Sequence, residues 1–224
     1  MKSRLFVFGD SWSLDYFKEP YLNSKEIKRY SKFYNEFGHW TNHMEKFFQV
    51  QNFSEGASSI ENIIYQLGNL PDFEDGDRII IIFGSPGRFV WIENGKDIRY
   101  SLGKKNSILH PLESQYIERT NYWLNESVDN NQKKFINKLN ILLKKYKPII
   151  TSWNEDFSNS FDFVDNLYKI ENLPHIEDES EGHCKDKHLG IIGNYEVFKY
   201  FLKRLNVDAN DYNFKFVKYK KTAI

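Results

Sequence analysis

The chain of 224 residues has a single cysteine, Cys184, and no long hydrophobic run. One cysteine excludes an internal disulfide framework and fits a reducing compartment. No apolar stretch approaches the ~20 residues of a membrane-spanning helix, so we expect no membrane span. The stretch Leu5–Phe8 is too short for a secretion signal, and Asp10 follows it closely. We therefore expect a cytoplasmic protein by default, with export by a route that leaves no N-terminal mark as the open alternative.

An excess charge of one sign is also absent. Lysine plus arginine total 31 and aspartate plus glutamate total 31, so the formal net charge is zero. A neutral chain has no global field that draws it to nucleic acid or to an anionic membrane, and we expect neither partner. Aromatic residues, in contrast, make up 17% of the chain. Part of them must fill a core, and the rest suit a groove for sugars or other flat-faced ligands.

Short apolar runs alternate with stretches of helical spacing, which predicts an α/β fold with a parallel sheet. The buried strands are expected at Arg4–Phe8, Phe48–Phe53, Arg78–Phe83 and Pro148–Trp153, with a poorly marked fifth near Leu167–Ile170. Helices are expected at Trp40–Phe48, from a capping box at Ser58 and Glu61 through Leu67, at Asn131–Tyr146 and at Ile191–Leu205, with further helical spacing from Ile27 to Phe37. No segment resembles a linker, so residues 1–224 are expected to form one domain.

The stretch from Val90 to Asn130 is longer than a connection between a strand and a helix requires. It is rich in aromatic residues, Trp91 and Trp123 among them. We interpret residues 90–130 as a lid-like insertion over the carboxyl edge of the sheet, where open parallel sheets bind ligands.

A serine follows the first predicted strand in the run Gly9-Asp10-Ser11-Trp12-Ser13. This order places a hydroxyl on the turn that leaves a buried strand, at the edge where α/β enzymes act. The structural alternative is that Ser11 caps the next helix. Near the other end, Asp186-Lys187-His188 offers the general base that a serine nucleophile needs, with the carboxylate to orient the imidazole.

The chain resembles the SGNH (GDSL-type) hydrolases, a family of serine esterases and acyl hydrolases defined by four sequence blocks. The blocks occur here in the family's order between residues 9 and 193. The resemblance implies a flavodoxin-like three-layer α/β/α sandwich, with Ser11 as nucleophile, His188 as base and Asp186 as its orienting carboxylate. The family usually has Asp-x-x-His, so Asp186 stands one residue closer than usual, while Gly193 keeps its spacing from His188.

In the family the oxyanion of the tetrahedral intermediate is held by the amide of the nucleophile and by a glycine after the second strand. The resemblance assigns these donors to Ser11 and Gly56. The third block departs from the family pattern, because Gly-x-Asn-Asp is replaced by Gly84-Ser85-Pro86-Gly87. Either the Ser85 hydroxyl or an amide of this turn replaces the asparagine, or one donor is lost, which typically costs about 3–4 kcal/mol of transition-state stabilisation.

Four further residues are candidates for substrate binding. Arg88 suits a substrate carboxylate or phosphate, although a structural ion pair is an equal alternative. Trp153 and Asn154 follow the fourth strand, where either a substrate-contacting pair or a buried tryptophan with a capping asparagine fits. Asp10, beside the predicted nucleophile, is the fourth candidate.

The sequence predicts a serine esterase that cleaves a small-molecule or glycan ester, with short acyl groups such as acetyl on a sugar as the suggested substrates. The triad needs no metal or organic cofactor. A metal site at His183, Cys184, Asp186 and His188 is the rival interpretation of that segment, but no usual ligand spacing fits. An acyltransferase with the same triad and an inactive binding module on the same fold are the alternative functions. The oligomeric state stays open.

Overall fold

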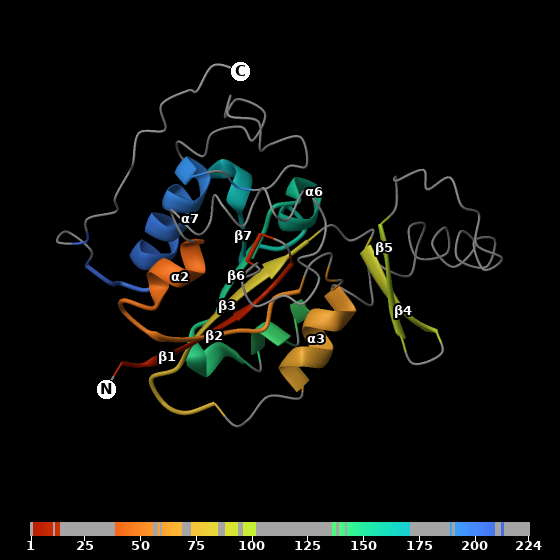
Figure 1. The fold of residues 1–224 in the computed structure, drawn as a ribbon, viewed down its shortest axis with the longest axis horizontal. Coiled ribbons are helices and arrows are strands. Elements are labelled where there is room, and N and C mark those ends of the chain that lie inside the picture. Colours follow the sequence, from red (N-terminus) through yellow and green to blue (C-terminus); the bar gives the residue numbers. More distant parts are fainter. Residues whose placement is uncertain are drawn as a thin grey trace, which may run out of the picture.

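The computed structural model describes residues 2–10, 12–13, 39–55, 58, 60–68, 73–84, 88–93, 96–101, 136–137, 139–141, 143–170, 189, 191–208 and 212. At its centre is a sheet of five strands: β1 (Arg4–Phe8), β2 (Gln49–Asn52), β3 (Arg78–Phe83), β6 (Ile149–Ser152) and β7 (Val164–Asn166). All of its pairings are parallel, and the spatial order is β2-β1-β3-β6-β7 (Figure 1). Numbered within this sheet alone, the order is 2-1-3-4-5, which is the flavodoxin-like order. The predicted fold class is confirmed.

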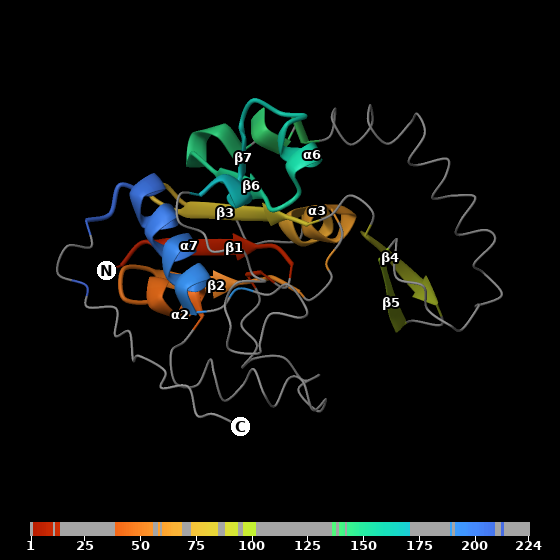
Figure 2. The same ribbon diagram turned by 90° about the horizontal axis from the view of Figure 1, so that it is seen from above.

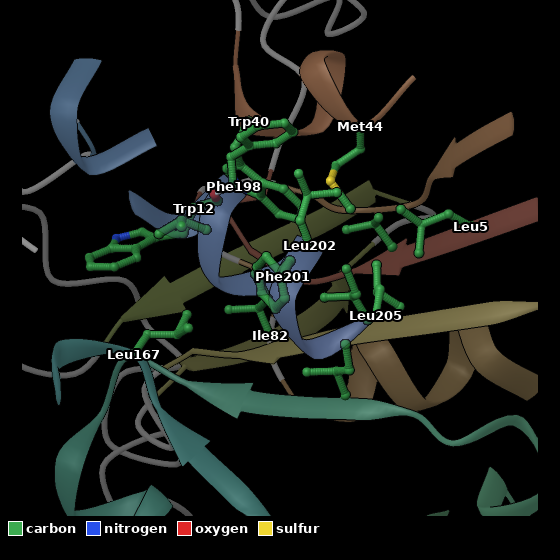
Figure 3. Packing of buried hydrophobic residues seen from close by; sticks show 14 of the residues in the cluster. Leu5, Trp12, Trp40, Met44, Ile82, Leu167, Phe198, Phe201, Leu202 and Leu205 are labelled. Carbon is green, nitrogen blue, oxygen red and sulfur yellow. Dashed lines mark hydrogen bonds between the residues drawn. The ribbon is translucent and has the colours of Figure 1, made fainter. Parts of the chain in front are cut away.

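The central strands bury side chains on both faces, as their continuous apolar sequences require. On one face, Leu5 and Val7 of β1 join Ile80 and Ile82 of β3 in a cluster with α2 (Trp40–Met44) and α7 (Ile191–Arg204). We call this the α7 cluster. Figure 3 shows its members between these helices and the sheet, with Trp12 at one end and Leu5 at the other.

The opposite face of the same strands forms a second cluster, which we call the α3 cluster. Phe6 and Phe8 of β1 pack there with Ile60 and Ile63 of α3 (Ile60–Gly68), and α6 (Glu155–Ser158) adds Phe157. Residues 136–137, 139–141 and 143 are helical and lead into a 3-10 turn at Lys144–Tyr146. This stretch adds Ile136, Leu139, Leu143 and Tyr146 to the α3 cluster. Figure 1 shows α2 and α7 on one side of the sheet and α3 on the other. The result is a three-layer α/β/α sandwich.

The fifth strand lies a few residues before the predicted position. The sequence suggested Leu167–Ile170, whereas β7 spans Val164–Asn166 and Leu167–Lys169 is a 3-10 turn. An edge strand pairs on one side only, and β7 has one buried residue followed by two partly exposed polar ones. Because β7 is mostly polar, its sequence does not indicate a strand. The apolar Leu167, on which the prediction was based, is buried although it lies in the 3-10 turn.

An antiparallel hairpin follows β3. Strands β4 (Arg88–Glu93) and β5 (Lys96–Ser101) form a separate two-stranded sheet that was not predicted. In Figures 1 and 2 the hairpin lies beyond the carboxyl end of β3, and β4 contacts α3. The rest of the predicted lid-like insertion lies outside the described residues, as does the helical spacing from Ile27 to Phe37.

An ion pair links β1 to the residue before β3 at the end of the sheet where these strands begin. The guanidinium of Arg4 donates from Nε to Oδ1 of Asp77 (2.9 Å) and from Nη2 to Oδ2 (2.6 Å). Asp77 is buried and also accepts a hydrogen bond from the Glu74 amide (2.7 Å). The hydrogen bonds from Arg4 hold the pKa of the Asp77 carboxyl below its ordinary value. This bidentate pair ties the start of β1 to the start of β3. Within the described part of the chain, no helix is long and apolar enough to cross a membrane.

Candidate active site

The predicted catalytic residues themselves lie outside the described residues, but their chain neighbours are described on several sides. The residues concerned are Ser11, Gly56, Ser85, Asp186 and His188, and the rival metal ligands His183 and Cys184 lie outside as well. Arg88 is the first residue of β4. The site can therefore be built from the segments that carry the predicted residues: the turn after β1, the end of β2, the end of β6 and the residue that follows His188.

Asp10 organises the turn after β1. Its side chain is 0% exposed. Oδ1 accepts a hydrogen bond from the Trp12 amide (3.0 Å), and Oδ2 accepts one from Nε1 of Trp153 (2.8 Å). The Asp10 carbonyl accepts from both the amide (3.1 Å) and the hydroxyl (3.2 Å) of Ser13. Both carboxylate oxygens thus bind parts of the protein, and the turn that carries Ser11 is closed by hydrogen bonds on either side of it.

The bond from Trp153 joins strands that are not neighbours. Trp153 follows β6, Asp10 follows β1, and β3 lies between these two strands in the sheet. The rings of Trp12 and Trp153 also stack, with their centroids 5.7 Å apart and an interplanar angle of 16°. The contact between the two loops therefore crosses the carboxyl end of β3, the strand that leads to Ser85. Trp153 is partly exposed.

Asn154, the neighbour of Trp153, is the N-cap of α6. Its Oδ1 accepts a hydrogen bond from the amide of Phe157 (2.8 Å), and its own amide donates to Oγ of Ser152 (2.9 Å). This is the usual geometry of an asparagine cap, which satisfies an amide that the helix leaves unpaired. The structure thus brings Asp10 and Trp153 into contact and gives Asn154 a capping bond.

Gly9 is required by close packing in the same turn. A Cβ atom at this position would lie 2.1 Å from Oγ of Ser13 and 3.1 Å from the carbonyl oxygen of Ile82. The absence of a side chain lets the end of β1 lie against β3 while the chain turns toward Ser11.

Two side chains that the sequence did not single out bind the carbonyl next to Ser11. The carbonyl oxygen of Trp12 accepts from Nε1 of Trp40 (2.8 Å) and from Nε2 of His39 (3.1 Å). Nδ1 of His39 lies 2.8 Å from Oγ1 of Thr41 and accepts from the Thr41 amide (3.4 Å). An acceptor role for Nδ1 places the proton of the neutral ring on Nε2. His39 and Trp40 are buried, so they fix this carbonyl from the start of α2.

The end of β2 holds the same turn from another side. Nδ2 of Asn52 donates to the carbonyl of Ser13 (2.6 Å), and the amide of Glu55 donates to the carbonyl of Gly9 (3.1 Å). Oδ1 of Asn52 accepts from the Ser54 amide (3.0 Å). Asn52 therefore connects the turn that carries Ser11 to the segment that leads to Gly56.

Asn194 connects α7 to the start of α2 and to the residue that follows His188. It is 0% exposed in the first turn of α7. Its Oδ1 accepts from the backbone amide of Trp40 (3.1 Å), and its Nδ2 donates to the carbonyl of Leu189 (3.0 Å). Leu189 directly follows His188 and is buried in the α7 cluster together with Trp12 and Trp40. The residues that follow Ser11 and His188 in the chain, 177 positions apart by their numbers (189 minus 12), thus share one cluster.

Sequence reasoning missed His39, Trp40, Asn52 and Asn194. Asn194 carried a usable signal, because it lies at helical spacing from the buried residues Val197, Phe198 and Phe201. A polar side chain on the buried stripe of an amphipathic helix must find partners there. His39 and Asn52 have no comparable signal, since the contacts that tie them to the turn, with the carbonyls of Trp12 and Ser13, are far away in the sequence.

The comparisons with known proteins find a likeness among solved structures. No family model matches the chain, and no curated protein matches it. Among solved structures, the chain is similar to a member of the lipolytic protein G-D-S-L family from Veillonella parvula DSM 2008, with 14% sequence identity and a TM-score of 0.32. The alignment covers 92% of this chain and 75% of that protein.

Proposed function

We propose that the protein is a serine ester hydrolase of the SGNH type, with Ser11 as nucleophile, His188 as general base and Asp186 as the carboxylate that orients it. The observation that carries the proposal is the meeting of Trp12 and Leu189 in the α7 cluster. Each of them is bonded in the chain to one member of the proposed pair. A hydrogen bond between a hydroxyl and an imidazole requires such proximity of their backbones.

A second line of support is the rigidity of the turn that carries Ser11. Bonds from β2, α2 and the loop after β6 hold its flanking residues. An activated serine needs this support, because a nucleophile acts only from a fixed position relative to its base and the oxyanion donors. In this proposal Asp10 acts through the turn, because its carboxylate is buried and engaged.

In the reaction, His188 takes the proton from Oγ of Ser11 as that oxygen attacks the ester carbonyl. The amides of Ser11 and Gly56, with Ser85, stabilise the negative charge on the carbonyl oxygen by donating hydrogen bonds to it. His188 then gives the proton to the leaving alcohol, and an acyl-serine remains. Water activated by His188 cleaves that ester and releases the acid.

The substrate would bind over the carboxyl end of the sheet, between the loop contact at Trp153 and the hairpin that starts with Arg88. We propose that residues 1–224 act as one domain whose insertion around residues 90–130 covers this edge. Short acyl groups, such as acetyl on a sugar, are the proposed substrates. The partly exposed indole of Trp153 is the candidate surface for the alcohol portion.

The proposal is tested by labelling and turnover together. The protein is incubated with a fluorophosphonate probe, and the modified peptide is located by mass spectrometry, while p-nitrophenyl acetate, butyrate and octanoate report turnover. We expect the label on Ser11, loss of label in Ser11→Ala and His188→Ala, and fastest turnover of the acetate. Measurement of the released acid and of acyl transfer to an added sugar acceptor distinguishes a hydrolase from an acyltransferase.

Matched controls use a serine and a histidine elsewhere in the fold. Ser158→Ala removes a buried hydroxyl that bonds within α6, and His43→Gln removes an imidazole of α2 that contacts Tyr212 (2.6 Å). Both variants should keep the label on Ser11. A wild-type protein that neither takes the label nor turns over any of the esters would overturn the proposal in favour of an inactive module.

A further inference from the structure

We infer that Asn194 is a positioning residue that couples the turn bearing Ser11 to the segment bearing His188. The inference rests on the proposed function and adds a residue to it that lies outside the triad and the oxyanion donors. The route has two hydrogen-bonded steps. Nε1 of Trp40 binds the carbonyl of Trp12, and the two ends of the Asn194 amide bind the Trp40 amide and the Leu189 carbonyl.

Both backbone partners of Asn194 lie at or just before the start of a helix. Trp40 is the first residue of α2, so its amide has no acceptor within that helix. The carbonyl of Leu189 precedes α7 and is buried with its residue. Leaving the buried Trp40 amide without an acceptor would cost about 1–3 kcal/mol, which makes its contact with Asn194 energetically significant. An asparagine side chain offers one acceptor and one donor group in the same plane and fits both partners at once.

The position of Asn194 makes the coupling rigid. It lies in the first turn of α7, whose residues Phe198, Phe201 and Leu202 pack against the sheet in the α7 cluster. A shift of Leu189 relative to α7 would break the bond from Nδ2, and a shift of Trp40 would break the bond to Oδ1. One amide therefore links the placement of the residue after His188 to that of the residue after Ser11. Misplacement of a catalytic group by 1 Å costs roughly a hundredfold in rate.

Two substitutions separate the two ends of this contact. Asn194→Leu has similar volume but binds neither partner, whereas Asn194→Asp keeps an acceptor for the Trp40 amide and places an oxygen against the Leu189 carbonyl. The matched control is Tyr200→Phe in the same helix, which removes the hydrogen bond from the Tyr200 hydroxyl to Asp165 of β7. That bond is partly buried and leads away from the site.

All variants are assayed at a temperature at which each is folded, judged by circular dichroism. We expect kcat on p-nitrophenyl acetate to fall about tenfold to a hundredfold in both Asn194 variants, with KM within about twofold of wild type, because alignment and not binding is lost. The rate of Ser11 labelling should fall in parallel at every pH, and Tyr200→Phe should match the wild type. Hydrogen exchange of peptides covering residues 9–13 should accelerate in Asn194→Leu but not in Tyr200→Phe.

The outcomes discriminate between the two proposals. If the wild type labels on Ser11 and the Asn194 variants retain the kcat of Tyr200→Phe, the positioning role is refuted and the proposed function stands. Unchanged exchange of residues 9–13 in Asn194→Leu would refute the coupling as well. If the wild type is neither labelled nor active, the proposed function fails and the positioning role fails with it, whereas exchange still reports on the contact itself.

Discussion

Asp10 shows how one buried side chain can determine the shape of a turn. Its two oxygens receive hydrogen bonds from its own turn and from a loop two strands away in the sheet. The sequence placed this carboxylate beside the predicted nucleophile and suggested substrate binding. The substrate-binding role stays a prediction, and in the structure both oxygens of this buried side chain have partners within the protein, which lowers the cost of burying it.

The first prediction concerns the bond between Asp10 and Trp153. Asp10→Asn turns one acceptor into a donor that faces either the Trp12 amide or Nε1 of Trp153, both of which are donors. We expect it to lower the free energy of unfolding by about 1–3 kcal/mol, measured by urea denaturation. Trp153→Phe removes the indole donor but keeps a ring against Trp12. In a double-mutant cycle the two changes should be coupled by about 0.5–3 kcal/mol, and strictly additive losses would contradict the contact.

The second prediction concerns the close approach at Gly9. Gly9→Ala places a methyl group 2.1 Å from Oγ of Ser13, so one of the two groups must move. We expect a loss of about 1–3 kcal/mol in the free energy of unfolding, since overpacking in a tight core has this cost. In a Ser13→Ala background the same change should cost less, because the nearest atom is gone. An equal loss in both backgrounds would show that Ser13 is not the obstacle.

At this scale the sequence predicted the turn but not what holds it. The run Gly9–Ser13 after an apolar strand is visible without a structure, because strand ends and turn residues are local features. The bonds to Trp12 from His39 and Trp40, 27 and 28 residues away, depend on where α2 packs. Pattern reasoning has no access to such contacts, so the supporting residues were missed while the turn itself was found.

At the scale of secondary-structure elements, the accuracy of the prediction depends on how buried each element is. Strands β1, β3 and β6 are buried along nearly their whole length and each contains a run of apolar residues, so they were predicted to within about a residue. The edge strand β7 is mostly polar and was misplaced. The β4–β5 hairpin was missed although Asn94-Gly95, which separates its strands in the sequence, is a strong hairpin signal.

The third prediction concerns the joint between the first residues of β1 and the segment before β3. The folded-state pKa of Asp77 is lowered chiefly by its hydrogen bonds from Arg4, so the stabilisation is present above the ordinary aspartate pKa of about 3.9 and is lost as the pH falls below it. Asp77→Asn should therefore lower Tm by a few degrees at pH 7. The difference in Tm from wild type should shrink as the pH falls below about 4.

The control for this joint is Glu74→Gln. Glu74 also faces Arg4 (3.4 Å), but its side chain is 75% exposed, and exposed ion pairs contribute little. We expect thermal scans to show almost no change for Glu74→Gln at any pH. A Tm difference for Asp77→Asn that stays constant from pH 7 to pH 3 would show that the carboxylate charge is not responsible.

On the scale of the whole molecule, one sheet serves two cores. Alternate residues of β1 point to opposite faces, so Val7 belongs to the α7 cluster and Phe8 to the α3 cluster. Because β1 contributes side chains to both clusters, its detachment from one of them would expose the other to solvent. This shared strand is the physical reason to expect that the three layers fold as one unit.

The fourth prediction follows from that shared strand. In the variant Trp91→Phe/Trp123→Phe, the remaining tryptophans include Trp12, Trp40 and Trp153, which lie at the α7 cluster. Fluorescence of this variant and far-ultraviolet circular dichroism should report the same urea midpoint, because loss of one face exposes the other. Two separated midpoints would show that the layers unfold independently.

Different contacts hold the two rims of the sheet. The Arg4–Asp77 pair fastens the rim where strands begin, whereas the bonds around Asp10 and Asn194 lie at the rim where β1 ends. Enzymes often trade turnover for robustness when both depend on the same contacts. With the proposed active site, the two demands fall at opposite ends of the strands, so a protein engineer can reinforce the first rim for heat tolerance and leave the proposed site untouched.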